Sequence, residues 1–231
     1  MTPPSAETAR VALYWAPERD DPLHRLGASW LGRDPETGAT LEQPPVPGFD
    51  LAEATADARL YGLHATLKAP FRLATPYAEF REGAMALAAH LRPFTLPPLA
   101  LENFGGFLAL RESQPSATLQ GFCDACVEAL DRFRAPLNEA EIARRRPERL
   151  EPRRRAHLER WGYPDVFGDW KFHVTLSRRL SEPEVALVRP LLEGHLGDVP
   201  ARPRPVRELC IFTQRAPGAP FLIAERLPLL G

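Results

Sequence analysis

The 231-residue chain has 44% apolar and 26% charged residues, an ordinary composition for a soluble globular protein. Its formal net charge of −1 gives no general attraction for nucleic acid or for an anionic membrane. No apolar run is long enough to span a bilayer and no signal-peptide pattern is present, so we expect a cytoplasmic protein that does not bind membranes.

The first part of the chain predicts a strand, a helix and a loop. Residues 10–16 are mostly apolar and typical of a strand, and Asp21 followed by Pro22 is typical of a helix start. Apolar residues continue at helical spacing to Trp30. The stretch 32–48 is rich in Pro, Gly and polar residues and predicts a loop, and a short helix is expected over 51–58.

Two later segments repeat one pattern. Residues 63–67 read Leu-His-Ala-Thr-Leu and residues 172–176 read Phe-His-Val-Thr-Leu, which is the alternation of a half-buried strand. On strands at about 61–68 and 169–178, each histidine shares a face with the threonine two residues later, and the apolar residues point to the other face. Two copies of such a polar face predict one site built from two halves.

A helix and two extended segments are predicted after each motif strand. The first helix begins at Thr75-Pro76 and ends before Pro93, and the second begins at Ser181 and runs to Leu192. Extended segments are expected over 94–103, 106–112, 206–213 and 221–227.

This shared order predicts a diverged duplication and an α+β fold. We expect one bilobal domain over 1–231, with two pseudo-symmetric antiparallel-sheet lobes, helices outside and a central cleft. The boundaries are about 10–112 for lobe one, 113–165 for a helical insert and 166–228 for lobe two.

The insert predicts helices over 117–134 and 138–160, and the second of these is rich in arginine. Cys123 and Cys126 have the spacing of a redox or half-zinc motif, but no second cysteine pair exists. Because both lie on an apolar helical stripe, we interpret them as buried structural thiols.

A pair of histidines can supply both a general base and a general acid near neutral pH. Hydrolysis of a phosphodiester needs both, and threonine hydroxyls can hydrogen-bond the phosphate oxygens. We therefore predict that His64, His173, Thr66 and Thr175 are catalytic, without a metal or another cofactor. A zinc site would need further ligands, and neither a Gly-x-Ser-x-Gly motif nor a Walker-type phosphate loop is present.

Other residues near the motifs are candidates for substrate binding. Lys68 and Lys171 are the only lysines, and strand alternation places each on the face of its neighbouring histidine. Lys68 and Lys171 are therefore predicted to bind phosphate. The remaining candidates are aromatic residues that could pack against a sugar and arginines that could hold a second anionic group, namely Tyr61, Trp161, Tyr163, Arg144 and Arg145.

The paired motifs resemble those of the 2H phosphoesterase superfamily. Within this superfamily, the chain also resembles the DUF1045 branch, a family of phosphonate-metabolism proteins. The resemblance is carried by segments 27–34 (GASWLGRD), 61–71 (YGLHATLKAPF), 106–110 (GFLAL), 133–136 (FRAP) and 160–164 (RWGYP). The resemblance implies that the two histidines and two threonines meet in a central cleft. It also implies metal-independent chemistry on a cyclic or diester phosphate, with a phosphoribosyl cyclic phosphate as the suggested substrate.

We therefore predict a monomeric phosphoesterase that hydrolyses a small cyclic phosphodiester. Two alternatives stay open. One is an RNA-end-processing 2′,3′-cyclic phosphodiesterase or RNA-binding protein that uses the arginine-rich helix. The other is a non-catalytic protein that binds a phosphorylated sugar.

Overall fold

The structure, a computed structural model, describes residues 10–231, and both strands and helices occur throughout this part of the chain. The strands are β1 (Arg10–Trp15), β2 (Ala65–Arg72), β3 (Phe94–Leu96), β4 (Leu99–Phe104), β5 (Phe107–Glu112), β6 (Val174–Arg179), β7 (Arg204–Val206), β8 (Glu208–Gln214) and β9 (Phe221–Pro228). The α-helices are α1 (Pro22–Leu31), α2 (Leu51–Ala54), α3 (Ala56–Tyr61), α4 (Tyr77–His90), α5 (Ala117–Leu130), α6 (Glu139–Arg145), α7 (Pro152–Trp161) and α8 (Glu182–Leu196). None of these helices is long and apolar enough to cross a bilayer.

Helix ends follow the caps that the sequence predicts. The Asp21 carboxylate accepts a hydrogen bond from the Leu23 amide at 2.8 Å, and Pro22 occupies the first turn of α1. Ser181 and Glu184 form a reciprocal capping box at the start of α8. Within the described residues, four short 3-10 helices join the longer elements: Asp131–Phe133, Pro147–Arg149, Phe167–Asp169 and Val199–Ala201.

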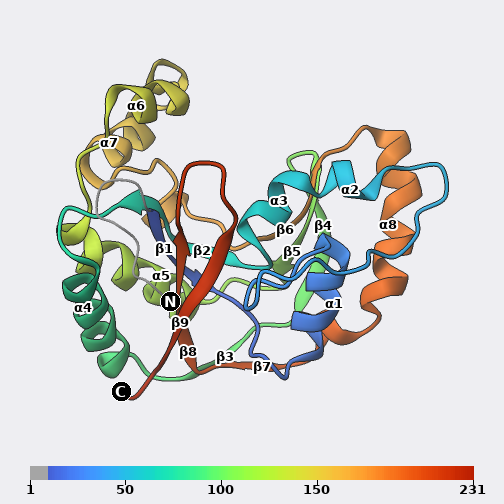
Figure 1. The fold of residues 1–231 in the computed structure, drawn as a ribbon, viewed down its shortest axis with the longest axis horizontal. Coiled ribbons are helices and arrows are strands. Elements are labelled where there is room, and N and C mark those ends of the chain that lie inside the picture. The colour runs from blue at the N-terminus through green and yellow to red at the C-terminus, as the bar shows by residue number, and fades with distance from the viewer. Residues whose placement is uncertain (1–9) are drawn as a thin grey trace.

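The two motif strands lie side by side at the centre of a seven-stranded antiparallel sheet. The strand order is β4-β5-β6-β2-β1-β8-β9, and β3 pairs separately with β7. Helices α4 and α5 lie toward one end of the molecule, and α1 and α8 lie together toward the other (Figure 1). The predicted α+β class, antiparallel sheets and outer helices are confirmed.

The strands of the two sequence halves are exchanged in space. Strands β4 and β5 come from the first half but extend the sheet from β6, and β8 and β9 come from the second half but extend it from β1. The sheet is therefore not divided at residues 112 and 166. Both halves of the chain are needed to build each side of the sheet.

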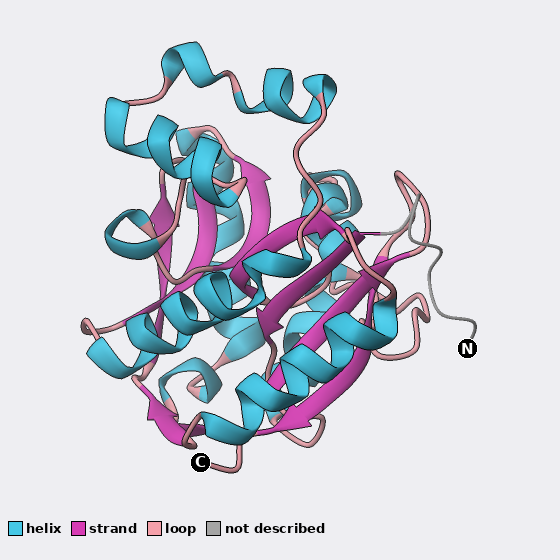
Figure 2. Ribbon diagram, turned by 90° about the vertical axis from the view of Figure 1, so that its left-hand side faces the viewer, coloured by secondary structure: helices cyan, strands magenta, loops and turns pink. Residues whose placement is uncertain are grey.

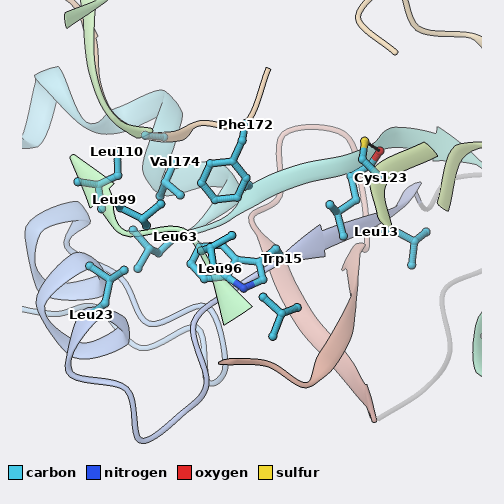
Figure 3. Close-up of a cluster of buried hydrophobic side chains, with 14 of the residues drawn as sticks. Leu13, Trp15, Leu23, Leu63, Leu96, Leu99, Leu110, Cys123, Phe172 and Val174 are labelled. Atoms are coloured by element: carbon cyan, nitrogen blue, oxygen red, sulfur yellow. Dashed lines mark hydrogen bonds between the residues drawn. The ribbon is translucent and has the colours of Figure 1, made fainter. Parts of the chain in front are cut away.

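The main core lies between the sheet and the helices (Figure 2). It includes the apolar residues of both motifs, among them Leu63, Phe172 and Val174, which Figure 3 shows beside Trp15 and Leu96. Cys123 and Cys126 are fully buried here, as predicted for structural thiols. A smaller apolar cluster covers the other face of β1 and β8 around Tyr14 and Phe212.

Both motif strands begin later than predicted. Helix α3 continues through Tyr61 and ends at Gly62, so β2 starts only at Ala65, and β6 starts at Val174. His64 and His173 therefore lie immediately before their strands. The predicted helix over 138–160 is also interrupted, because Arg146 adopts a left-handed backbone conformation (φ 49°) between α6 and a 3-10 turn.

The prediction that Lys68 faces the site is wrong because β2 contains a bulge. Leu13 and Tyr14 are adjacent on β1, but their partners on β2 are Lys68 and Thr66, so one extra residue is inserted between these two. The insertion reverses the alternation. Lys68 is 4% exposed and its ammonium group donates hydrogen bonds to the Val127 carbonyl and to Asp131, each at 3.1 Å.

Replacing Lys68 should cost stability rather than remove a substrate contact. Asp131 also pairs with Arg134 and Arg160, and without Lys68 this partly buried carboxylate loses one of its three cationic partners. We expect Lys68→Ala to lower the free energy of unfolding by about 3–5 kcal/mol, measured by urea denaturation. The other lysine is the control: Lys171 is exposed, and Lys171→Ala should change stability by less than about 0.5 kcal/mol. Equal effects of the two substitutions would contradict this account of Lys68.

Candidate functional site

A cavity of about 260 Å³ opens where β2 and β6 meet. Both histidines and both threonines of the repeated motifs lie in its wall: His64, Thr66, His173 and Thr175. The two strands pair through Ala65 and Val174, the residue after each histidine. Continuing this antiparallel register places His64 across from Thr175 and Thr66 across from His173. The local pseudo-symmetry therefore brings the two polar faces into one site.

Each imidazole is held in the same tautomer by a backbone carbonyl. The Nδ1 atom of His64 lies 2.8 Å from the Gly62 oxygen, and Nδ1 of His173 lies 2.7 Å from the Lys171 oxygen. A carbonyl only accepts hydrogen bonds, so each Nδ1 carries a proton and donates. In the neutral ring Nε2 is then the acceptor, and it is the nitrogen left for chemistry.

His64 is surrounded by aromatic rings. It stacks on Tyr14 with ring centroids 3.9 Å apart, and Tyr61 and Phe212 lie at 6.0 and 6.1 Å. Burial among these groups disfavours the charged imidazolium and lowers the pKa of His64 to about 4, and the nearby His173 acts in the same direction. His64 is therefore a neutral base at physiological pH.

His173 lies in a related but less enclosed environment. Its ring contacts Phe104 and Phe107, with centroids at 5.4 and 6.0 Å. Burial lowers the pKa of His173, and the positive charge of Arg111 lowers it further. The two histidines thus differ in exposure and in electrostatic surroundings, although their backbone geometry matches.

The threonines complete the polar faces. The Thr66 hydroxyl lies 3.3 Å from Nε2 of His64, so it can donate to the neutral ring nitrogen. The Thr66 carbonyl accepts a hydrogen bond from the indole of Trp170 at 2.7 Å, and the Leu176 carbonyl accepts one from the indole of Trp30 at 3.0 Å. These two indoles fix the backbone of both motif strands.

Gly62 has a conformational role in orienting His64. Its φ of +82° is a backbone conformation that residues other than glycine rarely adopt. An added Cβ would also lie 2.8 Å from the Pro35 Cβ. Arg33 donates to the carbonyls of Arg59 and Leu60 and so fastens the end of α3 next to the cavity. Tyr61 is placed by this helix end, not by a strand.

Three of the predicted substrate-binding residues lie in the cavity wall. Tyr61 and Tyr163 are aromatic walls, and the Arg145 guanidinium lies 4.7 Å from the centroid of the Tyr163 ring. Burial raises the pKa of Tyr163, so its hydroxyl stays protonated.

The other candidates do not line the cavity. Arg144 is exposed, because adjacent residues of a helix point in different directions and Arg145 takes the inward one. Trp161 packs on Phe167 at 5.1 Å. Lys171 is exposed because β6 starts three residues later, so strand alternation does not extend back to it. Only the Lys171 backbone carbonyl takes part in the site, as described for His173.

Several wall residues were missed by sequence reasoning. Tyr14 pairs directly with Thr66 across β1 and β2, but an aromatic residue inside a strand predicts only core packing. Asp57, on the first turn of α3, places an exposed carboxylate at the cavity, and no local signal in the sequence marks it. The remaining wall residues are Ala58, Ala69 and Pro70. Among residues 10–231, no group of three or more His, Cys, Asp or Glu side chains is arranged to hold a metal ion.

The lowered pKa of His64 predicts a pH-dependent stability. The unfolded chain binds a proton at this residue near pH 6.5 and the folded protein only near pH 4, so stability is lost as pH falls between these values. In wild type this contributes a loss of roughly 2–3 kcal/mol between pH 7 and 4.5. Urea unfolding of His64→Gln should show a correspondingly smaller loss. The exposed His90 is the control, and identical pH dependence for His64→Gln and wild type would contradict the assignment.

Comparison with known proteins identifies the family. The model of the family described as "Protein of unknown function (DUF1045)" matches residues 66–222. Two curated relatives are named ribose 1,5-bisphosphate phosphokinase PhnN. The one from Janthinobacterium sp. (strain Marseille) is 38% identical over 98% of this chain and 52% of its own length. The one from Laribacter hongkongensis (strain HLHK9) is 33% identical over 96% of this chain and 52% of its own. The chain spans about half the length of these relatives.

Solved structures of similar shape were also found. E. coli LigT complexed with 3′-AMP aligns over 97% of this chain and 100% of its own with a TM-score of 0.48 and 17% identity. A structure described as a phosphoesterase aligns over 96% and 99% with a TM-score of 0.45 and 16% identity. Because the family model covers most of the chain, the protein belongs to the DUF1045 family, as its motifs predicted.

Proposed function

We propose that this protein is a phosphoesterase of the 2H type that opens a small cyclic phosphodiester without a metal ion. The observation that carries the proposal is the pair of matching imidazoles in one cavity. Each donates from Nδ1 to a backbone carbonyl, and each is accompanied by a threonine two residues later. This is the arrangement that simultaneous general base and general acid catalysis requires.

The two histidines take different roles in this proposal. His64 is neutral because it is buried, so its Nε2 accepts a proton from the attacking water. The water oxygen bonds to phosphorus, and one P–O bond of the ring breaks. His173, protonated in the substrate complex, gives its proton to the departing oxygen, and the product is a phosphate monoester. Thr66 and Thr175 donate to the phosphate oxygens.

The size and charge of the cavity favour a small ligand. Its volume of about 260 Å³ lies just below the usual range of small-molecule pockets. Arg145 supplies one cation for a phosphate, and the Asp57 carboxylate is suited to accept from sugar hydroxyls while repelling a polyanion. RNA is therefore a poorer fit than a compact phosphorylated sugar.

The names of the relatives bear on the substrate class. Those proteins are named for acting on ribose 1,5-bisphosphate, and this chain corresponds to about half of each. The 231 residues contain no phosphate loop ending in Gly-Lys-Ser or Gly-Lys-Thr, so kinase chemistry is not part of the proposal. A phosphoribosyl cyclic phosphate is the substrate that we propose, in a monomeric protein.

A panel of cyclic phosphates assayed with excess chelator tests the reaction. Ribose 1,2-cyclic phosphates should be hydrolysed faster than 2′,3′-cyclic nucleotides or linear diesters, and EDTA should not reduce the rate. His64→Ala and His173→Ala should each lower kcat/KM by about 10²–10⁴-fold. His90→Ala, at the exposed C-terminal end of α4, is the matched control, and activity that survives in both motif variants would refute the mechanism.

The pH profile tests the division of roles. We expect kcat/KM to follow a bell, because the reaction needs neutral His64 and protonated His173. The acidic limb should fall near pH 4, the pKa of His64, and the alkaline limb below pH 6.5, because the pKa of His173 is lowered from that value. A rate that increases steadily from pH 5 to 9 would contradict this assignment.

A further inference from the structure

Arg111 is an arginine beside the second motif that the mechanism above does not use. Strands β5 and β6 pair through Ala109 with Thr175 and Leu110 with Val174. The next step of this register brings Arg111 alongside His173, on the face that carries the histidine and the threonine. Sequence patterns gave no reason to select this residue among the arginines of the chain.

The Arg111 side chain is mostly buried but makes few polar contacts. Its guanidinium carbon lies 4.3 Å from the centroid of the Phe104 ring, the same ring that contacts His173. The side chain is 17% exposed, and its Nε is buried without a hydrogen-bond partner. Within residues 10–231, its one ion pair joins Nε to the Glu112 carboxylate of the same strand at 3.6 Å, which is too long for a hydrogen bond.

Arg204 is a buried arginine whose guanidinium is fully engaged. The Arg204 side chain is 5% exposed and donates to Asp21, Val199 and Pro200. Leaving a charged donor without an acceptor in a partly buried place is costly, and the Nε of Arg111 is such a donor. What sets Arg111 apart from Arg204 is its place beside His173, where an anionic ligand would compensate its charge.

We propose that Arg111, which lies beside His173 just outside the cavity wall, binds an anionic group of the substrate that extends from the cavity on this side. The inference rests on the proposed function, and it specifies the substrate class further. A ligand that reaches both Arg111 and Arg145 carries two anionic groups, as a cyclic phosphate with a separate terminal phosphate does. A planar guanidinium can donate two parallel hydrogen bonds to a phosphate, and packing on Phe104 limits the freedom of this one.

This placement also couples ligand binding to the protonation of His173. In the free protein the positive charge of Arg111 opposes protonation of His173, and Asp165 acts in the opposite sense. Glu112 on β5 and Glu102 on the neighbouring β4 are the carboxylates of this sheet region. A bound anion offsets the positive charge of Arg111, so ligand binding raises the pKa of His173 and favours its protonated form. The imidazole is thereby prepared to act as an acid.

Binding of inorganic phosphate, followed by NMR of the histidine rings, tests the proposal without any turnover. Arg111→Gln should weaken phosphate binding by about 10–100-fold and raise the pKa of His173 in the free protein. Arg111→Lys keeps the charge but loses the planar fork, so it should weaken phosphate binding by about 3–10-fold. Arg132→Gln is the control, because that guanidinium also lies over a phenylalanine, Phe133 at 4.6 Å, but in a separate surface pocket beside α4.

The proposal is overturned if Arg111→Gln binds phosphate within twofold of wild type, or if the His173 titration is unchanged. Should Arg111→Gln not fold, wild-type phosphate affinity in Arg111→Lys overturns it equally. Because neither readout needs catalysis, failure of every cyclic phosphate as a substrate would refute the proposed function and leave this result standing.

Discussion

The antiparallel contact between β2 and β6 is the constraint on which the rest of the site depends. A single residue pair, Ala65 with Val174, sets the register of the two motif strands. A shift of one residue would turn one polar face into the core. The indoles of Trp30 and Trp170 hold this arrangement from α1 and from the segment before β6. Strands β4 and β5 continue the sheet beyond β6, and β1, β8 and β9 continue it beyond β2, so the two motif strands are enclosed on both sides.

His64 and His173 have matching backbone geometry, but their surroundings give the two imidazoles different tendencies to be protonated. His64 lies among Tyr14, Tyr61 and Phe212, which makes its charged form costly, whereas His173 has Arg111 as a close charged neighbour. The two imidazoles have matching backbone contacts, and the packing around them makes them unequal. Packing also gives Tyr14 two roles, because this fully buried ring belongs to the core and forms part of the cavity wall.

Much of the secondary structure could be predicted because its signals are local. Asp21-Pro22 and the Ser181–Glu184 box begin helices through contacts within one turn, and the predicted strands near residues 10–16, 206–213 and 221–227 are present. The predictions that depended on alternation over a distance were less secure. Lys68 was placed on the wrong face by one inserted residue, and Lys171 lies outside the strand altogether. Arg144 and Arg145 could not be separated without knowing where α6 sits.

The sequence by itself determined the family, the four motif residues and the repeated order of elements, because each of these can be recognised from residue types at fixed spacing. Only the tertiary structure decided how the two halves meet. Strand exchange, the bulge in β2, the burial of Lys68 against Asp131, and the positions of Tyr14, Asp57 and Arg111 all result from contacts between segments far apart in the chain. The register of a strand and the burial of its side chains depend on which other segments pack against it. The sequence of one segment does not specify those partners.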